Sequence, residues 1–409
     1  MNVVETRPGL EPATVTIEEL ENDPHGIFRR YRSRFPFIKR SDGAALVLRN
    51  RDVQQLFTDP RTRQAETEFP KLRGINDGTL FDFFKNSMLT SNGSDHLRRR
   101  SAFSTAFAFR AMAELRPYIR KVADELIDGF YAEGEIDFLD RYASQLPARL
   151  IGHILGMPLE DIPVFTRLVY TTTRVLSFRF TTEEIAEIEN AASQLMSYIE
   201  QLANARRAAP REDFLSTYLA AADQAGEMSP LEILIQIVLV VSAGSDTTRG
   251  ALAIQTSLLL QHRKQWDEVC RDSSRVSGAV AEALRFEPSV GSVSRFALKD
   301  IDLDGYVIKA GQFMQLSTMS AMRDEQIFQT PDTFDISRAD RQRWHLVFGG
   351  GAHRCLGEAL ARIELEEGLA ALAARIPQLQ LTEAPEVRGH ISVRRVSGMR
   401  VHWSIDRTA

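Results

Sequence analysis

Apolar residues recur at helical spacing along most of the chain. Residues three and four positions apart share one face of an α-helix, so this pattern predicts amphipathic helices. The predicted helices span residues 51–57, 96–107, 111–130, 143–155, 182–207, 230–261, 276–285 and 356–376.

Alternating apolar residues are confined to short segments with turn residues between them. Asp-Gly and Ser-Gly pairs supply the positive φ angles of tight turns. They predict three hairpins, over residues 37–49, 301–316 and 391–403. Three longer stretches show neither pattern and are expected to be irregular and functional: 62–95, 171–181 and 331–348.

No repeat or low-complexity linker divides the chain, so we expect one large domain over residues 1–409. The predicted fold class is mainly α with small β-sheets. We also expect no fused reductase or ferredoxin module, because the two cysteines cannot bind an iron–sulfur cluster.

Composition and charge exclude several classes of protein. The 50 Lys and Arg against 55 Asp and Glu give a formal net charge of −5, which disfavours nucleic-acid binding through phosphate neutralisation. The cysteines, Cys270 and Cys355, form neither a disulfide framework nor a CxxC site, so we expect a reducing, cytoplasmic location. The N-terminus lacks a signal sequence, and the most apolar stretch, 233–241, is about half a membrane span. We therefore expect a soluble protein with no membrane partner.

Residues 348–357, Phe-Gly-Gly-Gly-Ala-His-Arg-Cys-Leu-Gly, are the most informative segment. Glycines let a backbone approach a flat partner closely, and a cysteine at a helix N-terminus is expected to have a lowered thiol pKa. Taken alone, the residues leave three interpretations open: a buried structural cysteine, a nucleophilic Cys–His pair, or a zinc site of His345, His353 and Cys355.

This segment resembles the haem-binding loop of the cytochrome P-450 family, Phe-Gly-x-Gly-x-His-x-Cys-x-Gly, at every fixed position. The resemblance implies the cytochrome P-450 fold and heme b (iron protoporphyrin IX) with the Cys355 thiolate as the axial ligand of the metal. An anionic sulfur pushes electron density through iron and favours O–O cleavage. Phe348 would pack under the porphyrin, and backbone N–H groups of the loop, which includes Gly349, would tune the sulfur.

Residues 243–248, Ala-Gly-Ser-Asp-Thr-Thr, interrupt the apolar helix predicted over 230–261. A threonine hydroxyl can bond a backbone carbonyl and open a helix locally. The segment resembles the family's oxygen-activating sequence, which implies that Asp246 relays protons and that Thr247 steadies the oxygen intermediate.

Glu282 and Arg285 resemble the family's structural Glu-x-x-Arg pair, which supports the haem loop. Residues 330–338 resemble the segment that packs against this pair. Thr333 stands where a third basic residue often lies, which puts the local bracing of the loop in question.

Two buried propionates need cationic partners. The resemblance assigns this role to His96 and Arg100, four residues apart on one helix face, together with Arg295 and His353. The remaining arginines are expected to cluster on the cysteine side and to receive an acidic redox partner, with simple solvation as the alternative explanation: Arg98, Arg99, Arg341, Arg343 and Arg354.

Register with the family also predicts the substrate pocket. Its walls would be Leu239, Ser242, Ala243, Thr247, Val290, Val293, Arg395 and Val396, under a roof of Phe81, Phe83, Phe84, Met88 and Leu89. Such walls indicate a small or medium apolar organic substrate. Arg395 is a candidate for binding a substrate carboxylate, with exposure to solvent from a strand edge as the alternative.

The resemblance thus implies a haem-thiolate monooxygenase that inserts one atom of O2 by hydroxylation, demethylation or epoxidation. Electrons would come from a separate ferredoxin or flavodoxin with its NAD(P)H-dependent reductase. The alternative is a non-catalytic haem-binding sensor or carrier, which would not need Asp246 and Thr247.

Overall fold

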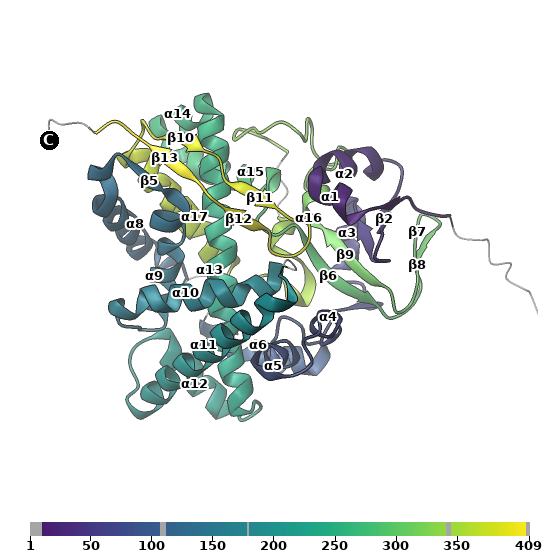
Figure 1. The fold of residues 1–409 in the computed structure, drawn as a ribbon, viewed down its shortest axis with the longest axis horizontal. Coiled ribbons are helices and arrows are strands. Elements are labelled where there is room, and N and C mark those ends of the chain that lie inside the picture. Colours follow the sequence, from purple (N-terminus) through teal and green to yellow (C-terminus); the bar gives the residue numbers. More distant parts are fainter. Residues whose placement is uncertain (1–9, 107–111, 178–179, 341–344, 406–409) are drawn as a thin grey trace, which may run out of the picture.

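A large helical part lies beside a smaller part built around a six-stranded sheet (Figure 1). The computed structural model describes residues 10–106, 112–177, 180–340 and 345–405. The fold class is mainly α with small sheets, as predicted from the sequence.

Helices supply most of the buried core. The N-terminal helices are α1 (Ile17–Asn22), α2 (Pro24–Arg32), α3 (Asn50–Leu56), α4 (Glu68–Leu72), α5 (Gly78–Asn86), α6 (Gly93–Ala106), α8 (Arg116–Phe130), α9 (Gln145–Ile154) and α10 (Ile162–Thr173). The later helices are α11 (Thr182–Ala208), α12 (Phe214–Ala225), α13 (Pro230–Gln261), α14 (Arg263–Arg271), α15 (Val276–Phe286), α16 (Thr318–Ala321) and α17 (Glu358–Arg375).

The main sheet has the strand order β1-β2-β3-β9-β6-β4. Its strands are β1 (Thr14–Val15), β2 (Phe37–Arg40), β3 (Ala45–Val47), β4 (Thr62–Arg63), β6 (Ser292–Ala297) and β9 (Phe313–Ser317). The smaller sheets are β10-β13-β5, β11-β12 and β7-β8. Their strands are β5 (Glu135–Asp137), β7 (Ile301–Leu303), β8 (Tyr306–Ile308), β10 (Gln380–Glu383), β11 (Glu386–Arg388), β12 (Arg395–Ser397) and β13 (Arg400–His402).

Helix α13 crosses the centre of the helical part (Figure 1). Its start is fixed locally, because Ser229 is the N-cap, Pro230 takes the first position and Glu232 completes a capping box. Its length and hydropathy alone would suffice to cross a membrane, but 67% of its most apolar window is buried inside the protein. This burial is typical of a core helix.

Each predicted helix is present, with ends shifted by a few residues; positions 107 and 111 lie outside the described residues. The hairpin turns at Gly43 and at Asp304-Gly305 are also correct, with φ of +88° at Gly43 and +55° at Asp304.

Two expectations were wrong. The stretch 62–95 is not irregular, because it contains β4, α4 and α5. The predicted hairpin over 391–403 does not form, because β12 pairs with β11 while β13 pairs with β10 and β5. The turn at Ser397-Gly398 therefore passes the chain from one small sheet to another.

Candidate functional site

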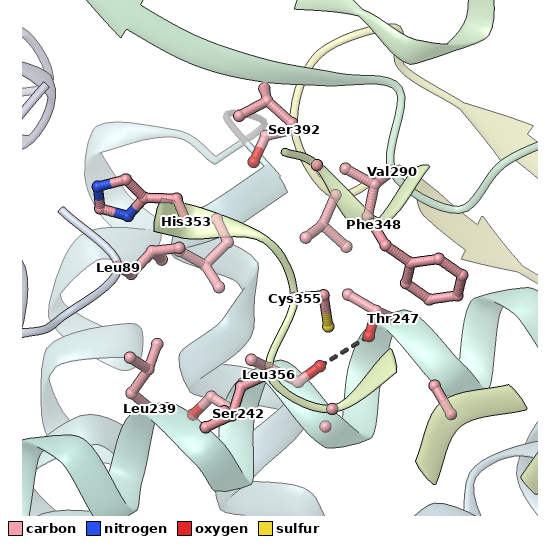
Figure 2. Close-up of a pocket in the computed structure, with 18 of the residues that line it drawn as sticks. Leu89, Leu239, Ser242, Thr247, Val290, Phe348, His353, Cys355, Leu356 and Ser392 are labelled. Carbon is pink, nitrogen blue, oxygen red and sulfur yellow. Dashed lines mark hydrogen bonds between the residues drawn. The ribbon is translucent and has the colours of Figure 1, made fainter. Parts of the chain in front are cut away.

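A cavity of about 380 Å³ lies between the middle of α13 and the loop that carries Cys355 (Figure 2). Strand β6, the bend at Ser392 and the segment from Gln64 to Thr90 complete its walls. Elements far apart in the sequence thus meet around one sulfur atom.

The Cys355 loop is a tight turn held by its own backbone. The Cys355 N–H donates to the Phe348 carbonyl over 2.8 Å, and Gly349 between them has φ +71°. A Cβ on Gly350 would lie 2.8 Å from the Cβ of Phe57, so the loop can pack on α3 only without a side chain there. The close approach that Gly350 permits is therefore to Phe57 of the protein itself.

The Cys355 sulfur is exposed to this cavity, three residues before α17 begins (Figure 2). The surrounding protein raises the pKa of the thiol by desolvation, which outweighs the Gly357 N–H and the nearby Arg100 and Arg354. The expectation of a lowered pKa was therefore wrong for the polypeptide alone. A cation bound to the sulfur would stabilise the thiolate, which fits a metal ligand better than a free nucleophile.

The zinc interpretation finds no support in the structure. His345 is buried, and its Nε2 lies 3.2 Å from the carbonyl of Ala281. No group of three or more His, Cys, Asp or Glu side chains able to hold a metal ion occurs in the part of the chain that the structure describes.

Three basic side chains line the cavity beside the cysteine, Arg100, Arg295 and His353, and His96 packs against His353 from behind. The rings of His96 and His353 lie 4.0 Å apart, and His96 Nε2 is buried without a hydrogen-bond partner. Burial lowers the pKa of Arg295 to about 10. Burial and the other three basic groups lower the pKa of His353 to about 3.

Among the described residues no carboxylate pairs with Arg295, which is only 3% exposed. Buried cations without anions are costly, so this cluster is built for negative groups from outside the polypeptide. Two propionates meet that need, and a sulfur ligand faces the same cavity. The residues present therefore fit haem.

Glu282 and Arg285 form an ion pair of 2.7 Å whose side chains are only 1% and 3% exposed. Arg285 also donates to the carbonyls of Met322 and Pro331. The third basic residue is present after all: Arg338 donates to Glu282 over 3.2 Å and to the Thr333 carbonyl. Sequence reasoning looked for it at position 333 and missed it five residues later.

Asp246 and Thr247 lie on the turn of α13 that faces the cavity. Thr247 donates to the Ala243 carbonyl over 2.7 Å, the dashed bond in Figure 2. Asp246 pairs with Arg249 at 2.8 Å, and that guanidinium lies 4.5 Å from the ring centre of Tyr170. Arg249 thus holds the Asp246 carboxylate at the edge of the cavity, and the Tyr170 ring in turn positions Arg249.

Most of the predicted wall lines the cavity: Leu239, Ser242, Ala243, Thr247, Val290 and Val293, with Phe84, Met88 and Leu89 from the roof. Phe81 and Phe83 do not. Arg395 is exposed on β12, and Val396 packs against Gly250 instead. The residues that replace them are Ser392 and Val393, because a bridge between Val290 and Val393 brings the chain to the cavity before β12 begins.

Glu364 on α17 also lines the cavity, and sequence reasoning did not find it. It is 2% exposed, its Oε1 is unbonded, and burial raises its pKa well above the ordinary value. An acid between the apolar Ile363 and Leu365 on the buried side of a helix was the available signal.

The arginines predicted as one exposed cluster are not equivalent. Arg98 and Arg99 both bind Glu232, and Arg99 is buried, so it cannot receive a partner. Arg354 pairs with Glu358 at 2.6 Å. Arg341 and Arg343 lie outside the described residues.

Comparison with known proteins identifies the family. Its model, described as cytochrome P-450, matches residues 164–375. The chain is 47% identical over 97% of its length to the plant-inducible cytochrome P-450 pinF1 of Rhizobium radiobacter, 94% of which is covered. The chain belongs to the cytochrome P-450 family. Heme b with a cysteine thiolate ligand is its defining cofactor, and the zinc and thiol-nucleophile interpretations are superseded.

Other P-450 relatives agree. The mycinamicin IV hydroxylase/epoxidase of Micromonospora griseorubida is 33% identical, with 83% of each chain covered. The crystal structure of CalO2 superimposes with a TM-score of 0.87 at 28% identity, covering 94% of this chain and 97% of that one. This P-450 is therefore a haem-thiolate monooxygenase that uses O2, an organic substrate and redox partners.

Proposed function

We propose that Cys355 is the thiolate ligand of haem and that His96, Arg100, Arg295 and His353 bind its propionates. The observation that carries this proposal is one cavity containing both an exposed sulfur and buried cations without carboxylate partners. Phe348 and Gly349 would form the surface beneath the porphyrin, and the Arg362 guanidinium lies 4.9 Å from the centre of the Phe348 ring. When bound, haem supplies the chemistry that activates O2 for insertion of one oxygen atom.

Asp246 and Thr247 are proposed to supply protons to the cavity. Thr247 Oγ1 donates to a helix carbonyl and can exchange that bond for one to water at small cost. Asp246 can take a proton from solvent when it leaves Arg249 and turns inward.

The proposed substrate is a small or medium, mainly apolar molecule. Phe69, Phe84, Met88, Ile151 and Leu239 make the side of the cavity that faces away from Cys355 mostly hydrocarbon. Such a site supports hydroxylation and epoxidation, the reactions for which the mycinamicin IV hydroxylase/epoxidase is named. The proposed electron donor is a separate ferredoxin or flavodoxin with its NAD(P)H-dependent reductase, in the cytoplasm.

The test is a visible spectrum of the purified protein, reduced with dithionite, with and without carbon monoxide. The native protein is expected to show the strongly red-shifted Soret band of thiolate-ligated haem, and Cys355→Ala is expected to lose it. Cys270→Ala is the matched control, because Cys270 lies outside the cavity lining, and it should keep the band. A native protein without the band after haem reconstitution would contradict the assignment of Cys355.

A further inference from the structure

Hydroxyl groups around the cavity differ in whether the protein satisfies them. Thr90, Thr247, Ser292 and Ser294 all line the cavity, and each has a hydrogen bond to another protein group. The Ser242 hydroxyl also lines the cavity, is buried, and has no partner.

Two nearby hydroxyls of α13 are bonded within the helix, and Thr256, which is also unbonded, lies outside the cavity lining. Ser245 donates to the Val241 carbonyl over 2.8 Å, and Thr247 donates to Ala243, as helix hydroxyls commonly do. Ser242 is one turn away on the same helix but makes no such bond. An unsatisfied buried hydroxyl costs free energy unless something from outside the chain completes it.

A second unusual serine, Ser392, faces the cavity from the bend before β12 (Figure 2). Its φ of +48° is in the left-handed region, which a non-glycine residue rarely adopts. The backbone holds it there, because its N–H donates to Ser292 Oγ and its carbonyl accepts from Gly291. Its own hydroxyl has no partner among the described residues. Strain of this kind is common where a side chain must be presented to a ligand.

The charged side chains around the cavity narrow the chemical class of the ligand further. Arg100, Arg295 and His353 belong to the proposed propionate cluster, and Arg354 is paired with Glu358. Arg395, the cation once expected to bind a substrate acid, lies on the exposed edge of β12. Among the described residues, the apolar part of the wall around Phe84 and Leu239 therefore offers no cation to a carboxylate.

We infer that Ser242 and Ser392 are specificity-determining residues, and that this cytochrome selects neutral substrates with an oxygen function, such as a ketone or an alcohol, on an apolar body. This inference rests on the proposed function, since it concerns the same cavity. Each hydroxyl can donate to a carbonyl oxygen or accept from an alcohol. A hydrocarbon of equal shape would leave both unsatisfied, and an acid would lose its hydration without gaining a cation.

The test uses three probes of nearly the same shape: 4-butylacetophenone, the hydrocarbon 1-butyl-4-isopropenylbenzene and 4-butylbenzoate. Their affinities for the haem-loaded protein are measured by displacement of imidazole, followed in the Soret band. The native protein is expected to bind the ketone about five- to tenfold more tightly than either other probe. Ser242→Ala should remove most of this preference by weakening the binding of the ketone while leaving the affinity for the hydrocarbon unchanged.

Two control variants separate recognition from structure. Ser245→Ala removes a buried hydroxyl from the same helix but not from the cavity, so the ratio of ketone to hydrocarbon affinity should not change. Ser392→Gly relaxes the strained backbone while removing the hydroxyl, so it should fold well and still lose several-fold affinity for the ketone.

A native protein that prefers the hydrocarbon or the benzoate, or that binds the ketone no better than the others, overturns the inference. Equal losses for ketone and hydrocarbon in Ser242→Ala also overturn it, because they indicate a packing role. Failure of the proposed function would be detected separately, because the carbon monoxide spectrum reports the haem ligand independently of the affinities for the three probes.

Discussion

The cysteine side of the cavity and the roof opposite are held by different kinds of contact. On the cysteine side, Glu282, Arg285 and Arg338 form a buried network that also binds several backbone carbonyls. The roof helix α5, which carries Phe84 into the cavity, is held by a few side chains: Glu189 and Ser193 at its start and Gln236 and Arg99 at its end. Many buried bonds fix a geometry, whereas a few part-buried ones permit local opening. A metal ligand needs a fixed geometry, whereas a substrate entrance needs local opening.

The largest expected effect comes from breaking the buried network. Arg338→Ala removes one arginine partner of Glu282, whose side chain is only 1% exposed. Losing a partner at this buried carboxylate should lower the free energy of unfolding by about 3–5 kcal/mol. Urea unfolding and haem content measure it, and haem retention should fall together with stability. The control Arg207→Ala breaks an exposed pair with Asp223 and should change stability by less than about 1 kcal/mol. Full stability of Arg338→Ala would mean that the network does not brace the loop.

The second prediction concerns pH and the part of the structure that supports the roof. Arg98, the Ser229 backbone and Arg99 lower the pKa of Glu232 to about 2 despite its burial, and Arg99 also donates to the Lys85 carbonyl at the end of α5. Because the folded pKa lies below the ordinary 4.5, the stabilisation is present above pH 4.5 and is lost as pH falls toward 2. The loss can reach about 3 kcal/mol.

Unfolding free energies between pH 5 and pH 3 test this prediction. Glu232→Gln should be less stable at pH 5 and should lose less on acidification than the native protein. Parallel curves for the two proteins would contradict it.

These two regions also show which features the sequence could predict. Local signals were enough for α13, whose N-cap, proline and capping box are adjacent residues, and for the Asp304-Gly305 turn. They were not enough for α5, because its N-cap Asp77 makes no capping bond and its first N–H groups are bound by Glu189 from α11. A helix completed by a residue more than a hundred positions away has no local signature.

The same distinction applies to the site. Cys355, Arg100 and Arg295 were predicted from motifs, and the structure places them around one cavity, with His96 in contact with His353 of the same wall. Arg395 was misplaced because the pairing of Val290 with Val393, a contact between distant segments, decides which residues reach the cavity. Arg338 and Glu364 were missed because their roles depend on burial, which spacing does not reveal.

The third prediction tests Asp246, which lies between the two regions. Asp246→Asn keeps the shape of the side chain but cannot carry a proton, so turnover with a supplied electron donor should fall about 10- to 100-fold. Haem content and the carbon monoxide spectrum should stay unchanged, and the solvent deuterium isotope effect should rise. Arg249→Gln frees the carboxylate and should preserve most of the activity. Unchanged coupled turnover in Asp246→Asn would remove it from the relay.

The smallest expected effect concerns the hydrogen bonds of Glu189 at the start of the roof helix α5. Glu189 Oε1 accepts from the Thr79 N–H over 2.5 Å and Oε2 from the Leu80 N–H over 3.1 Å, so one carboxylate of α11 caps α5. At the other end Gln236 accepts from the Met88 N–H and donates to the Asn86 carbonyl, but it is fully buried on α13. We therefore expect the part-buried end to open before the buried one.

Glu189→Gln keeps the side-chain size and one acceptor but loses the charge, which should cost about 1 kcal/mol of capping. Opening of α5 then becomes more frequent, so stopped-flow rates of imidazole association and dissociation should both rise about three- to fivefold while the dissociation constant stays nearly constant. Glu200→Gln, an exposed acid on the same helix, should leave both rates unchanged. A change in affinity without a change in the association rate would show that Glu189 shapes the closed cavity rather than its opening. The contrast between a fixed cysteine side and an opening roof would then depend on a residue other than Glu189.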